Sequence, residues 1–556
     1  MEIKKKNPVG IENYKAVVSE CYYVDKTLLI KELCDLPQGS AILFTRPRRF
    51  GKSLALSMIQ TFFERGEDNS QYFKNLAIGP YLNRFQSEEN AYPLIHFVMK
   101  NIGGDDYPSL LEKMKDAVSE EYARHEKDLL SSPNLNDIEK DYFQRIERKD
   151  VNEIELSSSL KKLTDFLQKC YQKDVVILID EYDNPIEEAR LKNYYAPAID
   201  FFRSFYGEGL KRESGIRLAV ISGVLQIAKE SLFSGLNNLL VSGITSPRFN
   251  SFYGFTEEET KQLLDYYGYA SSFEKVRSFY GGYHFGGLEI FNPWSVLNYA
   301  FHGVLDTYWT NTGRNASIGE LLSKNPVTLM SLLNQAVSPQ GVLAKIDAAV
   351  DYKELGASTD SALSFLASAG YLSLEESLAP MLYRLALPNQ EIQEAFSKEI
   401  KGRFLPESDQ QIYFQLQEGF RKGSAPTIEK CLETILTSFS YFEFKDERNY
   451  QALLLAINAI LFGEGIIKSE VPEGKGRCDI QIAPKTPGQI GIVIEVKHYK
   501  NTLSAQRMKE TSDKALEQIK AMDYTEELIQ RGATPIFAYG ISFIAKKVSV
   551  SSAEVK

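Results

Sequence analysis

Residues 41–53, AILFTRPRRFGKS, restrict the possible folds of this chain more than any other stretch. The apolar run 41–45 leads through a basic loop to Gly51, Lys52 and Ser53, and apolar residues at helical spacing follow at once. A strand, a loop and a helix with Gly-Lys-Ser at the junction form a cradle for nucleotide phosphates. The first helical turn offers unpaired N–H groups and a positive dipole end to the anion. The stretch therefore predicts an α/β domain that binds ATP.

Each residue type in this stretch has a part in that chemistry. Lys52 is expected to reach the β- and γ-phosphates, and Ser53 is expected to place its hydroxyl on Mg²⁺. Gly51 allows the backbone to come close to the phosphates. The nucleotide-binding residues predicted here are Arg49, Phe50, Gly51, Lys52, Ser53 and Leu54.

The loop in front of Gly51 departs from the usual pattern, because Arg46 stands where a first glycine is expected. Pro47 stiffens the loop, and its arginines make it strongly cationic. From the pattern alone, a basic turn before a helix is the alternative interpretation. The rest of the chain favours the phosphate-binding one.

A second signal is the apolar run 175–179, which is followed by Asp180 and Glu181. Branched apolar residues suit a central parallel strand, and open α/β sheets bind ligands at the carboxyl ends of such strands. Asp180 is expected in the Mg²⁺ shell, and Glu181 is expected to polarise the attacking water. Taken alone, the motif is also compatible with a purely structural strand. Asp183 is predicted to be a turn residue.

Further apolar runs extend the predicted sheet. One of them ends at Ser222, whose hydroxyl is expected to contact the γ-phosphate or the attacking water; an ordinary Ser-Gly turn is the alternative. Strands that alternate with helices predict a parallel sheet. The additional predicted strands cover residues 93–99, 216–221 and 239–244, and helical patterns cover residues 106–150 and 158–172.

Residues 447–545 predict a second α/β unit with the element order αβββαβ. Its apolar and amphipathic patterns alternate between the helical period and the strand period. The predicted helices cover residues 453–462 and 504–521, and the predicted strands cover residues 466–471, 477–482, 490–497 and 535–541.

Acidic and basic residues fall on one face of two of these strands. Glu495 and Lys497 are two positions apart and therefore point the same way, and Asp479 lies on the preceding strand. Neighbouring strands can bring Asp479 and Glu495 to one Mg²⁺, with Mn²⁺ as an alternative ion. The ion would lower the pKa of a bound water, and Lys497 would orient the nucleophile or offset charge on phosphorus. A surface ion pair is the alternative for this spacing alone.

Three other residues are candidates for the same site. Glu447 and Glu470 are possible ligands of the metal or of its water, and Gln518 on the following helix is a possible neighbour. The catalytic residues predicted for the whole chain are thus Glu181, Asp479, Glu495 and Lys497, and the predicted metal ligands are Ser53, Asp180, Asp479 and Glu495.

These residues together resemble two known families. The N-terminal half resembles the bacterial AAA-ATPase-like family of P-loop proteins, which also carries arginine at the position of Arg46. The C-terminal unit resembles the PD-(D/E)XK nuclease domain that is commonly fused to it. The matching stretches are YYVDKT (22–27), TRPRRFGKSL (45–54), ILIDEYDNP (177–185), AKESLFSGLNN (228–238), GRCD (476–479), IEVK (494–497) and ALEQIKAMDY (515–524).

The resemblance implies three parts and their ligands. Residues 1–285 are expected to form an AAA-like P-loop ATPase domain, residues 286–440 a helical or winged-helix connecting region, and residues 441–556 a PD-(D/E)XK domain. ATP and Mg²⁺ are the expected ligands. No arginine finger is assigned, and Arg248 and Lys229 are kept as candidates.

Composition limits the setting of this chemistry. The chain has 64 basic and 74 acidic residues, a formal net charge of −10, which argues against a general polyanion binder but not against a local basic groove. Five scattered cysteines without a CxxC motif indicate reduced thiols. We find no apolar run of membrane-spanning length and no signal-peptide pattern. A cytoplasmic protein is expected, and its oligomeric state is open.

The sequence leads to one main hypothesis and two alternatives. The main hypothesis is an ATP-binding and ATP-hydrolysing protein with a Mg²⁺-dependent nuclease domain that acts on DNA. The first alternative is a nucleotide-dependent switch whose C-terminal domain binds nucleic acid or protein without cleavage. The second is a nuclease fold that acts only on RNA or on damaged ends.

Overall fold

A computed structural model describes most of the chain, and all structural statements below concern its described residues. These are residues 4–211, 215–227, 232–233, 236–309, 321, 332, 335–336, 341–347, 349–350, 355, 358–396, 410–437, 447–461, 465–473, 476–499 and 504–555. The chain packs into two compact units. The first contains residues 1–313, 345–383 and 388–391, and the second contains residues 314–344, 384–387 and 392–556. The three-part division drawn from the sequence stays a prediction.

The first unit is built on a five-stranded sheet with the order β2-β3-β4-β1-β6. All neighbouring strands in it run parallel, which confirms the predicted parallel α/β sheet. Strand β3 is buried along its whole length, as its run of branched apolar residues predicts. The strands are β1 (Ser40–Thr45), β2 (Leu94–Val98), β3 (Val175–Asp180), β4 (Ile216–Gly223) and β6 (Leu239–Ser242).

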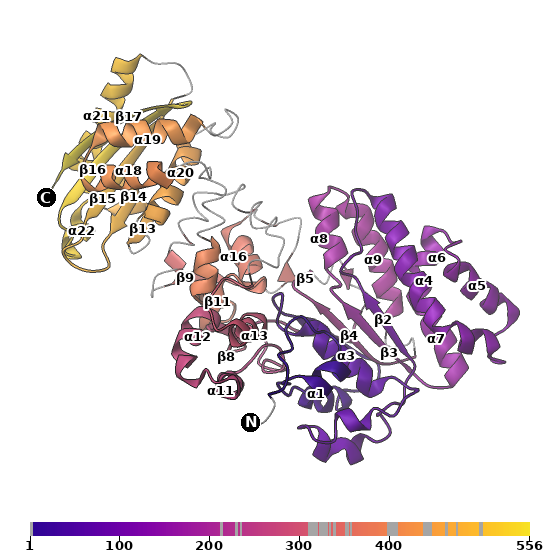
Figure 1. The fold of residues 1–556 in the computed structure, drawn as a ribbon. Coiled ribbons are helices and arrows are strands. Elements are labelled where there is room, and N and C mark those ends of the chain that lie inside the picture. The colour runs from indigo at the N-terminus through magenta and orange to yellow at the C-terminus, as the bar shows by residue number, and fades with distance from the viewer. Residues whose placement is uncertain are drawn as a thin grey trace. The chain divides into compact units, whose positions relative to one another are not determined.

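Helices of the first unit cover this sheet. Helix α3 buries Ala55, Ile59 and Phe62 at helical spacing against alternate residues of β1, β3 and β4. The helices are α1 (Tyr14–Glu20), α2 (Leu28–Cys34), α3 (Lys52–Phe63), α4 (Tyr107–Ser131), α5 (Asp137–Glu147), α6 (Glu153–Ser157), α7 (Ser159–Tyr171), α8 (Asn184–Leu191) and α9 (Tyr195–Gly209). Figure 1 shows helices α4–α7 gathered beyond the β2 side of the sheet.

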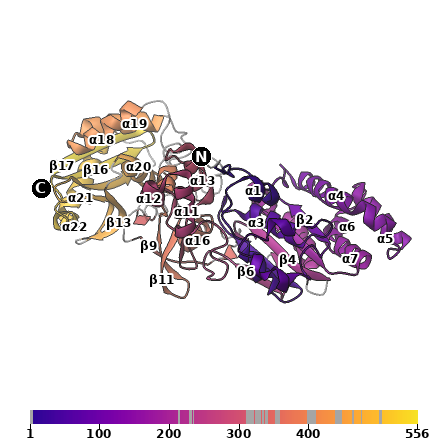
Figure 2. The ribbon, with the colours of Figure 1, turned by 60° about the horizontal axis from the view of Figure 1, so that its bottom comes forward.

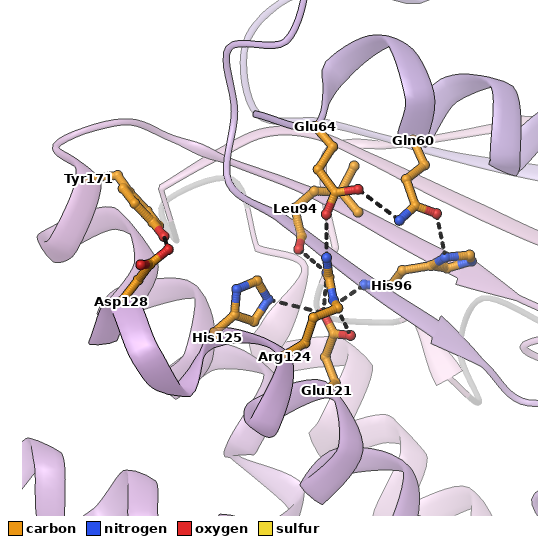
Figure 3. Close-up of polar contacts among 9 residues, drawn as sticks. All are labelled: Gln60, Glu64, Leu94, His96, Glu121, Arg124, His125, Asp128 and Tyr171. Carbon is orange, nitrogen blue, oxygen red and sulfur yellow. Dashed lines mark hydrogen bonds and ion pairs between the residues drawn. The ribbon is translucent and has the colours of Figure 1, made fainter. Parts of the chain in front are cut away.

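Helix α4 closes the free edge of strand β2 with its side chains. The backbone N–H of His96 donates to Oε1 of Glu121 at 3.0 Å, and Nη2 of Arg124 donates to the carbonyl oxygen of Leu94. Arg124 also pairs with Glu64 of the segment after α3 (Figure 3). Side chains of α4 therefore satisfy backbone groups that an exposed edge strand would leave open to another chain.

The remaining elements of the chain before residue 400 are short. Short strands occur here beside helices in the described part of these residues. The elements are β5 (Gln226–Ile227), α11 (Glu257–Tyr267), α12 (Phe273–Tyr280), β7 (Tyr283–Phe285), β8 (Leu288–Ile290), α13 (Pro293–His302), β9 (Val342–Lys345), β10 (Ala349–Val350), α16 (Thr359–Ser368), β11 (Ser373–Ala379) and β12 (Leu382–Ala386), with 3₁₀ helices at Ser70–Tyr72, Gly79–Phe85 and Ala270–Ser272.

The second unit contains a mixed five-stranded sheet with the order β13-β14-β15-β16-β17. Strands β15 and β16 are parallel, and the other neighbours are antiparallel. The predicted order αβββαβ is present from α20 to β16, with the short helix α22 before β16 and one further strand, β17, after it. The elements are α18 (Gln410–Arg421), α19 (Ala425–Thr437), α20 (Glu447–Leu461), β13 (Ile466–Glu473), β14 (Gly476–Ala483), β15 (Gly491–His498), α21 (Ala505–Met522), α22 (Glu526–Gln530), β16 (Ile536–Ile544) and β17 (Lys547–Glu554).

Two layers of helices enclose this second sheet. Figure 2 shows α18 and α19 on one face and α21 on the other. Ile480, Ile494 and Ile541 pack on the face of α18–α20, whereas Val493 and Ala538 pack on the opposite face with Ile519 of α21. In the part of the chain that the structure describes, no helix is long and apolar enough to cross a membrane.

Candidate functional site

The loop between β1 and α3 has the geometry of an anion cradle. Gly51 directly precedes α3 with a φ of 85°, a left-handed conformation that favours glycine. A Cβ atom at Gly51 would have no described atom within 4 Å, so the space in front of the helix end is open. No side chain of the described residues caps α3, and its first N–H groups therefore remain available to phosphate oxygens.

Lys52 is folded back onto this loop. Its amine is buried and donates to the carbonyl oxygens of Arg46 at 3.0 Å and Pro47 at 2.9 Å. Burial lowers the pKa of the amine, and the negative charge of Asp180 acts in the opposite direction. A phosphate would offer this amine charged acceptors in place of two neutral carbonyl groups.

Three elements converge on the carboxylate of Asp180, at the end of β3. Ser53 of α3 donates its hydroxyl to Oδ2 at 2.6 Å. Ser222 of β4 donates its hydroxyl to Oδ1, which also accepts the backbone N–H of Glu181 at 3.0 Å. The Ser53 hydroxyl and the Asp180 carboxylate are hard oxygen donors, so this pair fits a Mg²⁺ ion.

Glu181 follows Asp180 with a left-handed φ of 53°, which is unusual for a residue other than glycine. Burial raises the pKa of the Glu181 carboxyl, and the neighbouring charge of Asp180 raises it further. A carboxylate with a raised pKa is a better proton acceptor than an ordinary surface glutamate.

Arg46 does not face the open cradle. Its guanidinium is buried and donates to the carbonyl oxygens of Thr45 at 2.8 Å and Ser242 at 2.7 Å. It also lies 5.2 Å from the ring centroid of Phe285, and burial lowers its pKa to about 10. Arg46 therefore ties the start of the loop to the end of β6, a structural role at the position of the missing glycine.

The other predicted loop residues have mixed surroundings. The Arg49 guanidinium lies 4.3 Å from the ring centroid of Trp294. The Phe50 side chain is buried, and its ring centroid lies 5.0 Å from that of Tyr283. Leu54 packs against the apolar core under α3. For these three residues the described side-chain contacts are with aromatic or apolar groups, so their backbone N–H groups are the parts suited to a phosphate. Their assignment to nucleotide binding stays a prediction.

Asp183 has a larger part than the predicted turn residue. It is buried, and its Oδ2 accepts the backbone N–H groups of Val224 at 2.9 Å and Leu225 at 2.8 Å. Burial raises its pKa to about 6. Asp183 thus fixes the turn after Ser222, and its position three residues after Asp180 was the available sequence signal.

The second site lies on β14 and β15, under helix α21. Asp479 accepts the backbone N–H of Val496 at 2.7 Å through Oδ2. Burial raises the pKa of Asp479 to about 7, and the nearby Glu495 adds to the rise. Lys497 opposes this shift with its positive charge.

Glu495 is the most enclosed member of this site, with 2% of its surface exposed. Its Oε1 accepts Nζ of Lys497 and Nε2 of Gln518, each at 2.7 Å. Its Oε2 is buried and has no hydrogen-bond partner among the described residues. Burial alone would lower the pKa of the Lys497 amine. The contact with Glu495 outweighs this effect, so the pKa of Lys497 is raised.

A buried carboxylate oxygen without a partner is the observation that best fits a cation at this site. Asp479 and Glu495 would hold the ion, and Mg²⁺ accepts such a small set because it keeps several waters. Among the described residues, no group of three or more His, Cys, Asp or Glu side chains forms a larger metal cluster.

The outer candidates for this site are placed differently. Oε2 of Glu447 accepts the backbone N–H of His498 at 3.1 Å, and its charge adds to the rise in the pKa of Asp479. The side chain of Glu470 lies outside the described part of the chain, as does Lys229 of the first unit. Nη2 of Arg248, the other candidate for an arginine finger, lies 3.8 Å from Oε2 of Glu32 on α2.

Comparisons with known proteins agree with the two folds. They match two parts of the chain, an AAA-ATPase-like domain and a domain of the nuclease superfamily. Residues 8–233 belong to the family described as "Predicted AAA-ATPase", and residues 445–553 belong to the PD-(D/E)XK nuclease superfamily. Both resemblances inferred from the sequence are thereby confirmed.

One similar protein spans the whole arrangement. A protein of Azotobacter chroococcum mcd 1, described as "Uncharacterized protein in vnfD 5'region", is 25% identical over 560 aligned residues. The alignment covers 98% of each chain, so the similarity extends over both domains.

Proposed function

We propose that this protein binds and hydrolyses ATP in its N-terminal domain and cleaves DNA in its C-terminal domain with the help of Mg²⁺ or Mn²⁺. The observation that carries the nuclease part of the proposal is the buried, unpartnered Oε2 of Glu495. It lies on a carboxylate that Lys497 and Gln518 already orient through Oε1. Such an oxygen needs a partner, and the neighbouring carboxyl group of Asp479 favours a cation in that role.

In the ATPase site, each residue has a defined task. Lys52 and the first N–H groups of α3 bind the β- and γ-phosphates, and Ser53 and Asp180 hold Mg²⁺. The ion, when bound, offsets the charge of the phosphate oxygens. Glu181 accepts a proton from the attacking water, and Ser222 keeps Asp180 in place through its hydrogen bond to Oδ1.

In the nuclease site, Asp479 and Glu495 hold the cation, and Gln518 fixes the orientation of Glu495. The ion, when bound, lowers the pKa of a water and stabilises charge on the scissile phosphate. Lys497 lies 2.7 Å from Glu495, where its amine can position the nucleophile or offset the charge that develops on phosphorus.

All five cysteines are free thiols. Free thiols persist in reducing compartments, and this supports our proposal that the protein acts in the cytoplasm.

A cleavage assay tests the proposal. Single-stranded DNA, double-stranded DNA and RNA are each incubated with Mg²⁺ or Mn²⁺, with and without ATP. We expect the wild type to cut DNA and Asp479→Ala to lose at least about 10²-fold in rate, because a metal ligand is removed. Glu517→Ala removes an exposed carboxylate of α21 beside Gln518 and serves as the matched control.

The outcomes separate the hypotheses. Equal cleavage by the wild type and Asp479→Ala would refute the nuclease proposal. Cleavage of RNA alone would show that RNA, and not DNA, is the substrate. Metal-dependent binding of DNA without cleavage would favour the nucleotide-dependent switch.

A further inference from the structure

The phosphate loop carries three arginines, and the structure gives them different surroundings. Arg46 is buried among backbone carbonyl groups, and Arg49 stacks on the Trp294 ring. Arg48 instead keeps 35% of its side chain exposed and reaches α8, where its Nη2 lies 3.3 Å from Oε2 of Glu187. Helix α8 begins directly after the Asp180–Asp183 turn. Arg48 therefore extends from the phosphate loop to the acidic edge of the ATPase site.

The charge of Arg48 acts on both sides of that site. Burial and Asp180 raise the pKa of Glu181, and Arg48 is one of the cations that oppose this rise. Burial lowers the pKa of Lys52, and Arg48 adds to this lowering. The guanidinium therefore lies within electrostatic reach of both the proton acceptor and the phosphate-binding lysine.

The backbone of the loop is held in place on both sides of Arg49. Nε1 of Trp309 donates to the carbonyl oxygen of Arg48 at 3.0 Å, and the backbone N–H of Gly254 donates to the carbonyl oxygen of Phe50 at 3.1 Å. The backbone of the loop is therefore anchored, whereas the Arg48 side chain is partly exposed and held by one contact with Glu187.

We propose that Arg48 is a catalytic residue of the ATPase site, an arginine finger that the phosphate loop of the same chain supplies. When ATP binds, the guanidinium leaves Glu187 and binds the γ-phosphate. A guanidinium matches phosphate oxygens with two parallel donors, whereas its contact with Glu187 is a single one at 3.3 Å. The inference rests on the ATPase function proposed above and adds the cation that stabilises its transition state.

The proposed reaction transfers the γ-phosphoryl group of ATP to water. The oxygen of a water forms a bond to the γ-phosphorus, and the bond from phosphorus to the β,γ-bridging oxygen breaks with its electron pair on ADP. Glu181 accepts the proton of the water. Arg48 offsets the negative charge on the γ-phosphate oxygens during the transfer, and ADP and inorganic phosphate leave.

Two other described cations are weaker candidates for this role. Lys100 follows β2 and also opposes the raised pKa of Glu181, but its ammonium cannot bind two phosphate oxygens in the planar manner of a guanidinium. Arg248 lies over the ring of Phe249 at 4.7 Å and near Glu32. We include Lys100→Ala in the test for this reason.

Turnover and equilibrium binding test the inference together. ATP hydrolysis is measured for the wild type, Arg48→Ala, Arg48→Lys, Glu187→Gln and Lys100→Ala, with Arg203→Ala as a control for loss of one exposed arginine. ADP affinity is then measured with and without aluminium fluoride, which mimics the transferred phosphoryl group. Arg48→Ala is expected to lose about 10³-fold in kcat. Aluminium fluoride should also no longer increase the affinity of this variant for ADP.

The remaining variants define the role of Arg48. ADP affinity of Arg48→Ala should stay within about threefold of the wild type, which also shows that the variant is folded. Arg48→Lys should recover little activity, and Glu187→Gln should keep its kcat within about threefold, because the ion pair is not needed for catalysis.

Several results would overturn the inference. Three results would show that Arg48 does not act in the transition state, although ATP hydrolysis itself would stand. These are wild-type turnover in Arg48→Ala, a loss of kcat in Glu187→Gln equal to that in Arg48→Ala, and a loss of kcat in Lys100→Ala in place of Arg48→Ala. A wild type that binds ATP without turnover would instead contradict the proposed hydrolysis, and with it the catalytic role of Arg48. A wild type that binds no ATP would overturn both.

Discussion

At the scale of single residues, the carboxyl group of Asp479 is the most informative. Burial, assisted by Glu495, raises its pKa to about 7, well above the ordinary value of 3.8. Below that pH the group holds a proton, and the proton competes with a cation for the same oxygens. Above it, the carboxylate is charged in a site that already contains the Glu495 carboxylate, and a divalent ion relieves this repulsion.

The affinity of the second site for Mn²⁺ should therefore depend on pH. Between pH 6.5 and pH 5.5 we expect it to fall by up to about tenfold, because binding must displace one proton from Asp479. Above about pH 8 it should level off. Calorimetric titration of Mn²⁺ in the absence of nucleotide measures this, and a flat profile from pH 5.5 to pH 8 would contradict the assigned ligand.

The sequence predicted the site residues whose chemistry lies in contiguous motifs. The roles of Lys52, Ser53 and Asp180 can be predicted from their local motifs, because a loop, a helix start and a strand end bring these residues together. Arg48 and Trp309 could not be found this way. Their surroundings depend on contacts between segments that are far apart in the chain, and the loop pattern alone does not distinguish one arginine from the next.

At the scale of secondary-structure elements, the attachment of α4 to β2 explains how the first sheet ends. Glu121 is buried, and burial alone would raise the pKa of its carboxyl, but its contacts with His125 and Arg124 outweigh this effect and lower the pKa. The charged carboxylate then accepts the backbone N–H of His96. Helix α4 thus covers the edge of the first sheet at β2.

Glu121→Ala should destabilise the first unit by about 2–4 kcal/mol. The change leaves the N–H of His96 without its acceptor and removes a partner of Arg124. Chemical denaturation measures the difference. Glu120→Ala removes an exposed carboxylate one position earlier on the same helix and should stay within about 0.5 kcal/mol of the wild type. Equal stability of the two variants would contradict the edge-closing role.

Helix α21 packs against the second sheet through Gly540, which pairs with Glu495 across β15 and β16. A Cβ atom at Gly540 would lie 2.1 Å from the carbonyl oxygen of Ser512, a backbone atom of the helix. Gly540→Ala should move α21 and withdraw Gln518 from Glu495.

We expect Gly540→Ala to cost about 1–3 kcal/mol of stability and to weaken Mn²⁺ binding at the second site. Thermal unfolding and metal titration report the two effects. Gly207→Ala is the matched control, because no described atom lies within 4 Å of its added Cβ and alanine suits the interior of α9. Unchanged metal affinity in Gly540→Ala would argue against the positioning role of α21.

Strands that are buried along their whole length could be predicted from the sequence, and the mostly exposed strand β11 could not. Strands β1 and β3 are apolar runs that are buried along their whole length, so the pattern alone reveals them. Strand β11 exposes most of its residues and contains mostly polar or small side chains, a composition that predicts no strand. Its conformation depends on pairing with neighbouring strands, and such pairing leaves little trace in the local pattern.

At the scale of the whole molecule, we propose that the chain combines two sites that bind metal by different routes. In the first, Ser53 and Asp180 form half of a shell that a bound triphosphate completes. In the second, Asp479 and Glu495 supply both carboxylates from neighbouring strands, without a nucleotide. The central claim is therefore that one chain holds two independent cation sites, and that one of them depends on ATP.

Counting bound Mn²⁺ by electron paramagnetic resonance tests this claim most directly. The wild type should bind one ion without nucleotide and a second one with a non-hydrolysable ATP analogue. Lys52→Ala should lose the nucleotide-dependent ion alone, and Asp479→Ala should lose the other ion alone. A single class of sites, or the loss of both ions in either variant, would contradict the account.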